Sequence, residues 1–198
     1  MKLNKFTLTL TLLCGFIIML TACKNEKKIT FESLNGVWIG EAYGSQVSIV
    51  FINEIAFFTD DGIAMQADYN IENNEGSIYV WYNDYKFKLN GNVLTITGEN
   101  DKYYFNKDTN VKESPSSIDG VWYGPSPWVF ACLNNLVFIT DEENDTDYGT
   151  FKLTGDKGEF ECNGWLAGTF TVDGSELTID ETGYFNRIVK FTKSENAE

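Results

Sequence analysis

The sequence contains no histidine, only 3 prolines, and fewer basic than acidic side chains, 15 against 29 in 198 residues. The absence of histidine excludes a Ser-His-Asp triad and an imidazole metal site. The acidic excess opposes binding to nucleic acid and to anionic lipid head groups, because like charges repel. We therefore expect no nucleic-acid partner and no cofactor, and no group of residues is typical of an enzyme.

A long apolar run occurs only at the start of the chain. Lys2 and Lys5 precede residues 6–20, which are mainly apolar and lead into small residues. The run is shorter than the roughly 20 apolar residues of a membrane-spanning helix, and the order is typical of a secretory signal peptide. We predict a signal peptide at residues 1–22. Its removal leaves 13 basic and 29 acidic side chains, a net charge of −16.

The signal segment ends in Leu-Thr-Ala-Cys at residues 20–23, which resembles the lipobox of bacterial lipoprotein precursors. The resemblance implies cleavage after Ala22, diacylglycerol on the Cys23 thiol, and acylation of the new amino terminus by a chain such as palmitate. Several acyl chains, at about 0.8 kcal/mol per buried methylene, anchor a protein stably where one chain does not. The alternative is an ordinary signal peptide followed by a chance cysteine.

The residues after Cys23 form a short polar segment, so we interpret residues 23–33 as a lipidated tether. Residue 24 is Lys and not Asp. This resembles the pattern of the lipoproteins that many two-membrane bacteria transport to the outer membrane. We therefore expect a lipid-anchored protein of the bacterial cell envelope, and we favour the outer membrane or cell surface over the inner membrane.

The rest of the chain has the pattern of two copies of one module. Gly-Val-Trp occurs at residues 36–38 and at 120–122, and three further blocks recur in the same order at offsets of 79 to 83 residues. Small changes in offset are what loop insertions in a duplicated domain produce, and chance similarity is the alternative. We predict a module at residues 34–106, a linker at 107–117, a second module at 118–193 and a tail at 194–198.

Each module is predicted to consist of short β-strands. Apolar and polar residues alternate at residues 63–71, which predicts that one strand face points inward with Ile63, Met65, Ala67, Tyr69 and Ile71. Asn90-Gly91 and Asp173-Gly174 are typical of hairpin turns at matching places, and no window shows a helical pattern. Six to eight strands in chain order predict an antiparallel meander whose edges are removed by closure. We predict an all-β chain with two tandem small antiparallel meander β-barrels.

A Gly-x-Trp motif near the start of such a meander resembles the lipocalins and the wider calycin group, and more closely the small lipocalin-like modules of bacterial lipoproteins. In that group the first-strand Trp closes one barrel end, and a basic side chain of the last strand packs across it. The resemblance implies this role for Trp38 and Trp122. It implies Arg187 as the cover of Trp122, through a cation–π contact of about 0.5 to 2 kcal/mol.

For Trp38, the candidate covers are Lys102 and Lys107. Each copy has about half the length of a typical lipocalin barrel. We therefore expect aromatic and aliphatic side chains to fill much of the interior.

The cysteines and acidic turns offer little chemistry. Cys132 and Cys162 remain after processing, and they either form a disulfide or are two buried free thiols. In a meander they lie on the second and fifth strands of the module, which are not neighbours. Acidic residues alternate at 141–147, but Thr146 occupies the position where a calcium loop needs glycine. We favour a solvated acidic turn and predict no metal site.

Aromatic residues are the remaining candidates for binding. Tyr79, Trp81 and Trp128 either lie at a rim, where they suit contact with a sugar or a protein, or fill the core. We predict a membrane-anchored bacterial lipoprotein that acts as a non-catalytic binding module, at its rims and loops or between the copies. The alternative is a lipocalin-like carrier of a small apolar ligand. The ligand is left open between a protein, a glycan and a small apolar molecule.

Overall fold

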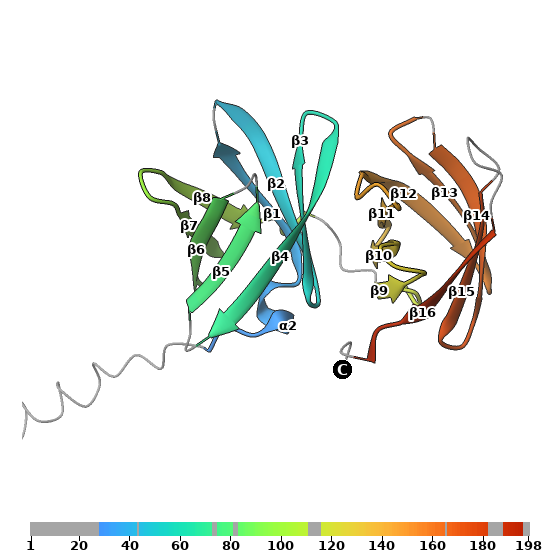
Figure 1. Ribbon diagram of the computed structural model, residues 1–198. Helices are drawn as coiled ribbons and strands as arrows, with labels where there is room; N and C mark the ends of the chain where they lie inside the picture. Colours follow the sequence, from blue (N-terminus) through green and yellow to red (C-terminus); the bar gives the residue numbers. More distant parts are fainter. Residues whose placement is uncertain are drawn as a thin grey trace, which may run out of the picture.

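The computed structural model describes residues 28–42, 44–72, 75–80, 83–110, 116–164, 166–181 and 188–195. These residues fold almost entirely into antiparallel β-strands, after a short helix α2 (Phe31–Leu34) (Figure 1). Cys23 and the predicted signal peptide lie outside the described residues. Within the described ranges, no helix has the length and apolar character needed to cross a membrane.

The first eight strands form the N-terminal half of the structure. They are β1 (Gly36–Ala42), β2 (Ser45–Ile52), β3 (Ile55–Asp60), β4 (Ile63–Glu72), β5 (Glu75–Val80), β6 (Asn83–Asn90), β7 (Val93–Thr97) and β8 (Lys102–Lys107). Each strand pairs antiparallel with the next, and β8 pairs back with β1. The result is a closed eight-stranded antiparallel barrel.

The eight further strands form the C-terminal half. They are β9 (Gly120–Tyr123), β10 (Val129–Leu133), β11 (Leu136–Thr140), β12 (Thr146–Thr154), β13 (Lys157–Cys162), β14 (Leu166–Asp173), β15 (Glu176–Glu181) and β16 (Ile188–Lys193). They pair in the same order, and β16 lies beside β9. The prediction of an all-β chain with antiparallel meanders is confirmed.

Both predicted hairpin turns are confirmed. Gly91 follows β6 with a φ of +61°, and Gly174 follows β14 with a φ of +59°, a left-handed backbone that glycine adopts without steric cost. The helix α2 was not predicted, because one turn is too short for a periodic apolar pattern. It has a capping box, in which the Thr30 hydroxyl accepts the Ser33 N–H and the Ser33 hydroxyl accepts the Thr30 N–H.

Strand β4 matches the predicted strand at residues 63–71, but the predicted inward position of Ile63 is wrong. Ile63 is 70% exposed because it lies at the turn between β3 and β4, whereas Ala64 is 7% exposed. Ala64 is buried because the outer face of this strand is covered by the C-terminal half, where its backbone pairs with Thr146. The alternation of apolar and polar residues along one strand does not reveal that the outer face of that strand packs against another part of the protein.

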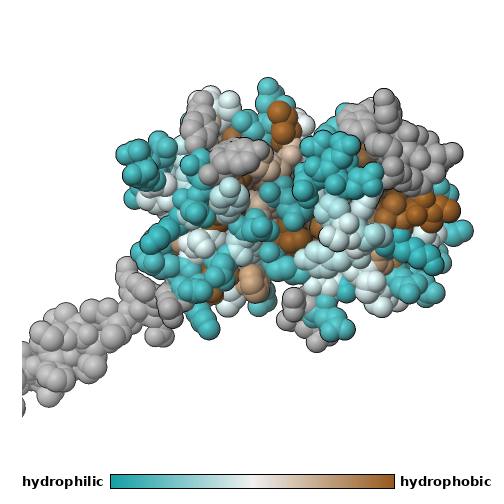
Figure 2. Space-filling model, viewed as in Figure 1, coloured by the Kyte–Doolittle hydropathy of each residue, from teal (hydrophilic) through white to brown (hydrophobic). Residues whose placement is uncertain are grey.

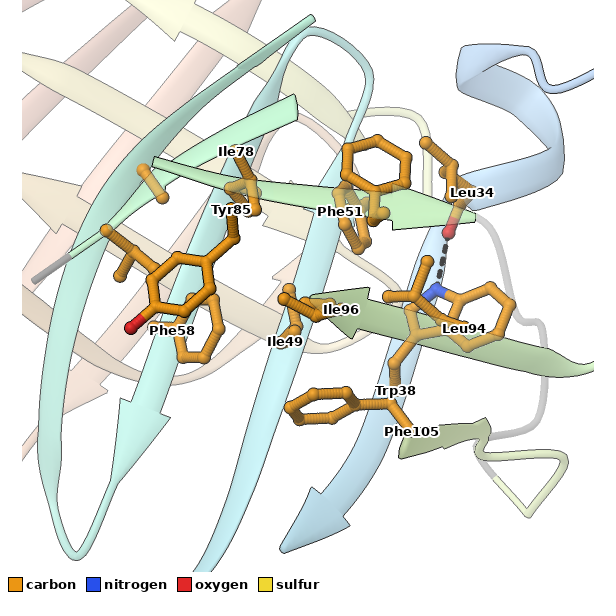
Figure 3. Close-up of a cluster of buried hydrophobic side chains, with 14 of the residues drawn as sticks. Leu34, Trp38, Ile49, Phe51, Phe58, Ile78, Tyr85, Leu94, Ile96 and Phe105 are labelled. Carbon is orange, nitrogen blue, oxygen red and sulfur yellow. Dashed lines mark hydrogen bonds between the residues drawn. The ribbon is translucent and has the colours of Figure 1, made fainter. Parts of the chain in front are cut away.

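Each half contains its own apolar core. The first core includes Trp38, Phe51, Phe87 and Phe105, and Figure 3 shows many of its side chains converging inside the barrel. The second core includes Trp122, Phe130, Phe170 and Phe191. On the face seen in Figure 2, hydrophilic residues dominate and hydrophobic residues form only small separate patches. Burial of these cores is the main favourable contribution to stability.

A third apolar cluster joins the halves, and we name it the inter-half cluster. It contains Val37, Val50, Ile52, Ile55, Phe57, Ala64, Val121, Val129, Ala131 and Phe138. Phe57 and Phe138 stack at its centre, with ring centroids 4.3 Å apart and planes 11° apart. These two residues are equivalent in the sequence repeat, at an offset of 81 residues. The two halves therefore meet through outer faces that hold matching positions of the predicted repeat.

In each half, a polar residue before the first strand accepts a hydrogen bond from the turn between the second and third strands. The Asn53 N–H donates to Asn35 Oδ1 at 2.7 Å, and the Asn134 N–H donates to Asp119 Oδ2 at 3.0 Å. Partial burial raises the pKa of the Asp119 carboxyl, and its hydrogen bonds partly oppose that shift. Asn35 accepts the equivalent hydrogen bond as a neutral amide, so no charge is buried at this position of the first half.

Candidate functional site

The tryptophan of the first motif is buried in the core of the N-terminal barrel, beside helix α2. Trp38 is fully buried, and its Nε1 donates to the carbonyl oxygen of Leu34, the last residue of α2, at 2.7 Å (Figure 3). The Lys107 amino group lies 5.6 Å from the centroid of the Trp38 ring. Of the two candidate covers for Trp38, the structure places Lys107 there. Lys102 instead lies over Tyr104, 5.3 Å from that ring centroid.

The second motif repeats this arrangement in the C-terminal half. Trp122 is fully buried, its Nε1 donates to the Ile118 carbonyl oxygen at 2.8 Å, and the Lys193 amino group lies 5.3 Å from its ring centroid. The resemblance to lipocalin-like modules implied Arg187 for this place, and Arg187 lies outside the described residues. Lys193 was missed, although its position at the end of the last strand matches that of Lys107.

The backbone conformation explains why each motif contains a glycine. Gly36 and Gly120 have φ values of +131° and +124°, which side chains other than glycine rarely adopt. A Cβ added to Gly36 would lie 2.9 Å from Cε of Lys107. The Gly-Val-Trp motif thus combines the buried ring with the bare backbone over which the lysine chain passes.

The interior of the N-terminal barrel is filled at the end away from Trp38. The cavity there has a volume of only about 10 Å³ and is lined by Ala42, Phe58, Val80, Tyr85, Ile96, Tyr103 and Phe105. A cavity needs about 10 to 15 Å³ to hold a single water molecule. This space therefore does not accommodate a small apolar ligand.

Large aromatic side chains fill both interiors against glycines of neighbouring strands. A Cβ added to Gly76 would lie 1.9 Å from the Phe87 ring, and one added to Gly158 would lie 2.0 Å from the Phe170 ring. In the C-terminal half the Phe130 ring contacts Phe170 at a centroid distance of 5.8 Å. The sequence contains this glycine and phenylalanine pair once in each half, so the pair is a signal of the filled interior that the repeat itself carries.

The two cysteines lie where predicted, on β10 and β13, and both are free buried thiols. Burial raises the pKa of Cys132 well above its usual value and raises the pKa of Cys162 to about 12. A thiol nucleophile acts as the thiolate, so neither residue is poised for nucleophilic chemistry. Of the two alternatives for these cysteines, the structure contains the free thiols.

The acidic loop of the C-terminal half is held by its own backbone. Asp141 Oδ1 accepts the N–H groups of Glu143 and Asp145 at 2.8 and 3.1 Å. This carboxylate therefore stabilises the turn that the loop makes. In the part of the chain that the structure describes, no three acidic or cysteine side chains are grouped to hold a metal ion.

The region between the halves is occupied by side chains. Besides the inter-half cluster, Glu54 Oε1 accepts the Tyr123 hydroxyl at 3.2 Å and the Ser194 hydroxyl at 2.6 Å. Burial, with a smaller contribution from the Glu54 charge, raises the pKa of Tyr123 to about 12. These contacts fix the C-terminal end of the described chain against the N-terminal half.

A groove on the outer surface of the N-terminal barrel is the candidate binding site, and we name it the β1–β8 groove. Its volume is about 570 Å³, and it is lined by Ile39, Gly40, Glu41, Gln46, Lys102, Tyr103, Tyr104 and Asn106. It lies where the ladder between β1 and β8 ends after three residue pairs, from Trp38 with Lys107 to Gly40 with Phe105. Ligand pockets commonly measure about 300 to 1,000 Å³.

The exposed aromatic residue of this groove is Tyr104, which is 55% exposed. The aromatic residues predicted from the sequence as candidates for binding were Tyr79, Trp81 and Trp128. Tyr79 is 48% exposed on β5, Trp128 is half-buried, and Trp81 lies outside the described residues. Tyr104 was missed because it neighbours Tyr103 and Phe105, and a run of three aromatics does not reveal which ring points outward.

Comparison with known proteins gives no family. No protein-family model matches the sequence, and no curated protein matches it. Among solved structures, the chain is similar to the DnaN sliding clamp (DNA polymerase III subunit beta) from Bartonella birtlesii bound to griselimycin, with 10% sequence identity and a TM-score of 0.24. The match covers 85% of this chain and 59% of the clamp chain. A TM-score this low supports no conclusion about fold or function.

Proposed function

We propose that this protein is a membrane-anchored bacterial lipoprotein that acts as a non-catalytic binding module at the cell envelope. One observation carries the proposal: the cavity lined by Phe58, Tyr85 and Phe105 inside the N-terminal barrel measures about 10 Å³, whereas the groove on the outer surface measures about 570 Å³. A ligand of ordinary size fits the second and not the first. The carrier of a small apolar ligand is therefore the weaker alternative.

We further propose that the two halves are tandem lipocalin-like barrels derived from one module. The buried Trp with a lysine across its ring occurs once in each half, as Trp38 with Lys107 and Trp122 with Lys193. The equivalent Phe57 and Phe138 stack where the copies meet. On this proposal, the inward-facing residues stabilise the fold and are similar in both copies, whereas the residues of the outer surface differ between the copies.

The proposed anchor is a lipid on Cys23, which places the barrels beside a membrane, at the outer membrane or cell surface. The test is metabolic labelling with a palmitate analogue, followed by membrane fractionation, for the full chain and for Cys23→Ser. We expect label and membrane association for the first and neither for the second. Equal labelling of both chains would contradict the anchor.

The proposed binding surface is tested by placing a photo-crosslinking amino acid in the full chain at Asn106, in the β1–β8 groove. The matched control is Thr192, the exposed residue that precedes Lys193 as Asn106 precedes Lys107. We expect a defined crosslinked product in intact cells from position 106 and not from position 192. Crosslinking from neither position, or equally from both, would contradict binding at this groove.

A further inference from the structure

The β1–β8 groove combines an exposed aromatic ring with side chains that both donate and accept hydrogen bonds. Tyr104 is 55% exposed, and the Gln46 and Asn106 amides line the same groove. Each amide offers a carbonyl acceptor and two N–H donors. Glu41 and Lys102 add one charge of each sign, so the lining carries no net charge. This neutrality contrasts with the net charge of −14 of the whole chain.

The C-terminal half provides an internal comparison for these residues. Both halves retain the buried Trp, the covering lysine and the motif glycine. By strand register, the positions that match Lys102, Tyr104 and Asn106 hold Ile188, Lys190 and Thr192. Counting on from the paired strands, Glu41 and Gln46 fall on Pro125 and Pro127, which lie in the turn between β9 and β10. The last strand of the second half therefore forms without the groove side chains of β8. Lys102, Tyr104 and Asn106 are thus not required for the pairing of that strand or for core packing.

The chemistry of the groove selects among ligand classes. A phosphate or other anion would require more than one cation to offset the acidic surroundings. An apolar ligand would leave the amides, Glu41 and Lys102 without partners that replace water. A sugar ring has one face of C–H groups, which packs on an aromatic ring, and hydroxyls at its edge that both donate and accept. Among these classes, the neutral sugar matches every part of the lining.

We propose that the β1–β8 groove binds a neutral oligosaccharide, with one sugar ring on the exposed face of Tyr104 and hydroxyls hydrogen-bonded to Gln46, Asn106 and Glu41. The Lys102 amino group lies over one face of the Tyr104 ring, 5.3 Å from its centroid, so the sugar ring would take the opposite face. This inference rests on the proposed function, because it names the ligand class of the same surface.

The experiment uses the full lipidated chain in a detergent without a sugar head group, which would compete for the site. Tetra-N-acetylchitotetraose, cellotetraose and maltotetraose, which are all neutral, are titrated by calorimetry, with saturation-transfer NMR to identify the contacted sugar protons. The variants are Tyr104→Ala, Tyr104→Phe and Gln46→Ala. Tyr79→Ala is the matched control, because Tyr79 is a comparably exposed tyrosine on β5, outside the groove.

We expect at least one of the three oligosaccharides to bind. Tyr104→Ala should weaken binding by about tenfold, as loss of one main contact does, and Tyr104→Phe by no more than about threefold. Gln46→Ala should weaken it, and Tyr79→Ala should leave it unchanged. Absence of binding by all three, or equal affinities of Tyr104→Ala and Tyr79→Ala, would overturn the inference.

The crosslink at Asn106 separates failure of this inference from failure of the proposed function. A protein crosslinked at position 106, together with no oligosaccharide binding, would overturn the glycan and leave the binding surface in place. No crosslink at position 106 and no oligosaccharide binding would overturn both. A crosslinked product that is digested by glycosidases would support both.

Discussion

Replacing Phe57 tests whether the two halves stabilise each other. Phe57 is fully buried in the inter-half cluster, outside both barrel interiors, and stacks on Phe138 at 4.3 Å. Truncating a buried Phe to Ala costs about 3 to 5 kcal/mol, of which the aromatic pair contributes about 0.5 to 1.5 kcal/mol. Because neither interior loses an atom, this free energy should come from the coupling between the halves. Phe57→Ala should therefore make them unfold separately.

The assay is pulse-labelling hydrogen exchange across a urea titration, read by mass spectrometry on peptides from each half. In the unmodified chain we expect peptides of β1–β8 and β9–β16 to lose protection at one urea concentration. In Phe57→Ala we expect two midpoints. Phe58→Ala is the matched control, because Phe58 is the next residue of β3 and points into the first core. It should lower stability and leave the coupling contacts in place.

A double-mutant cycle with Phe138→Ala isolates the aromatic pair. The two substitutions should cost less together than the sum of each alone, because they remove the same contact. The reasoning would be refuted if Phe57→Ala changed stability by less than about 0.5 kcal/mol, the usual range for surface substitutions, with coincident midpoints for both halves.

Three further predictions concern single positions. Gly76→Ala should lower the free energy of unfolding by about 1 to 3 kcal/mol in urea titrations, because its Cβ would lie 1.9 Å from the Phe87 ring. Asp119→Asn should match or exceed the original melting temperature at pH 7. Burial raises the folded-state pKa of Asp119, so its contribution to stability falls as pH rises from the unfolded value toward the folded one. The difference should vanish in acid, where the carboxyl is protonated in both states. Lys107→Met keeps the chain over Trp38 but removes the charge, and should cost about 0.5 to 1 kcal/mol in thermal denaturation.

Each of these has a contradicting result. Additive effects of Gly76→Ala and Phe87→Leu would show that the two side chains do not compete for one space. A pH-independent difference for Asp119→Asn would show that the carboxyl charge is not the cause. An unchanged stability of Lys107→Met, with a loss in Lys107→Ala, would assign the lysine a packing role alone.

The sequence predicted the strands well because turns and alternation are local. Asn90-Gly91 is recognisable as a turn without any tertiary information, and the two Gly-Val-Trp motifs marked the first strand of each half. The partner of Trp122 was harder, because a basic residue over a ring is a long-range contact and several basic residues lie near the end of the chain. The register of β16 with β9 selects Lys193.

The surface features could not be predicted for a different reason. Ile63 and Ala64 have the alternation of an ordinary barrel strand, and only the presence of the second half buries Ala64. The β1–β8 groove depends on where the ladder between two strands, distant in sequence, comes to an end. Tyr104 becomes a candidate ligand contact only when that register is known.

The most direct test of the central claim is a native mass spectrum of the protein isolated from the membranes of its own cells, in a detergent without a sugar head group. We predict the mass of the lipidated chain, bare or with a ligand that is lost on Tyr104→Ala. The barrel interior is tested in parallel with Ala42→Leu, which adds volume at the filled end of the first core. A bound small molecule that persists in Tyr104→Ala and is lost in Ala42→Leu would show a ligand inside the barrel, and would contradict binding at the outer surface.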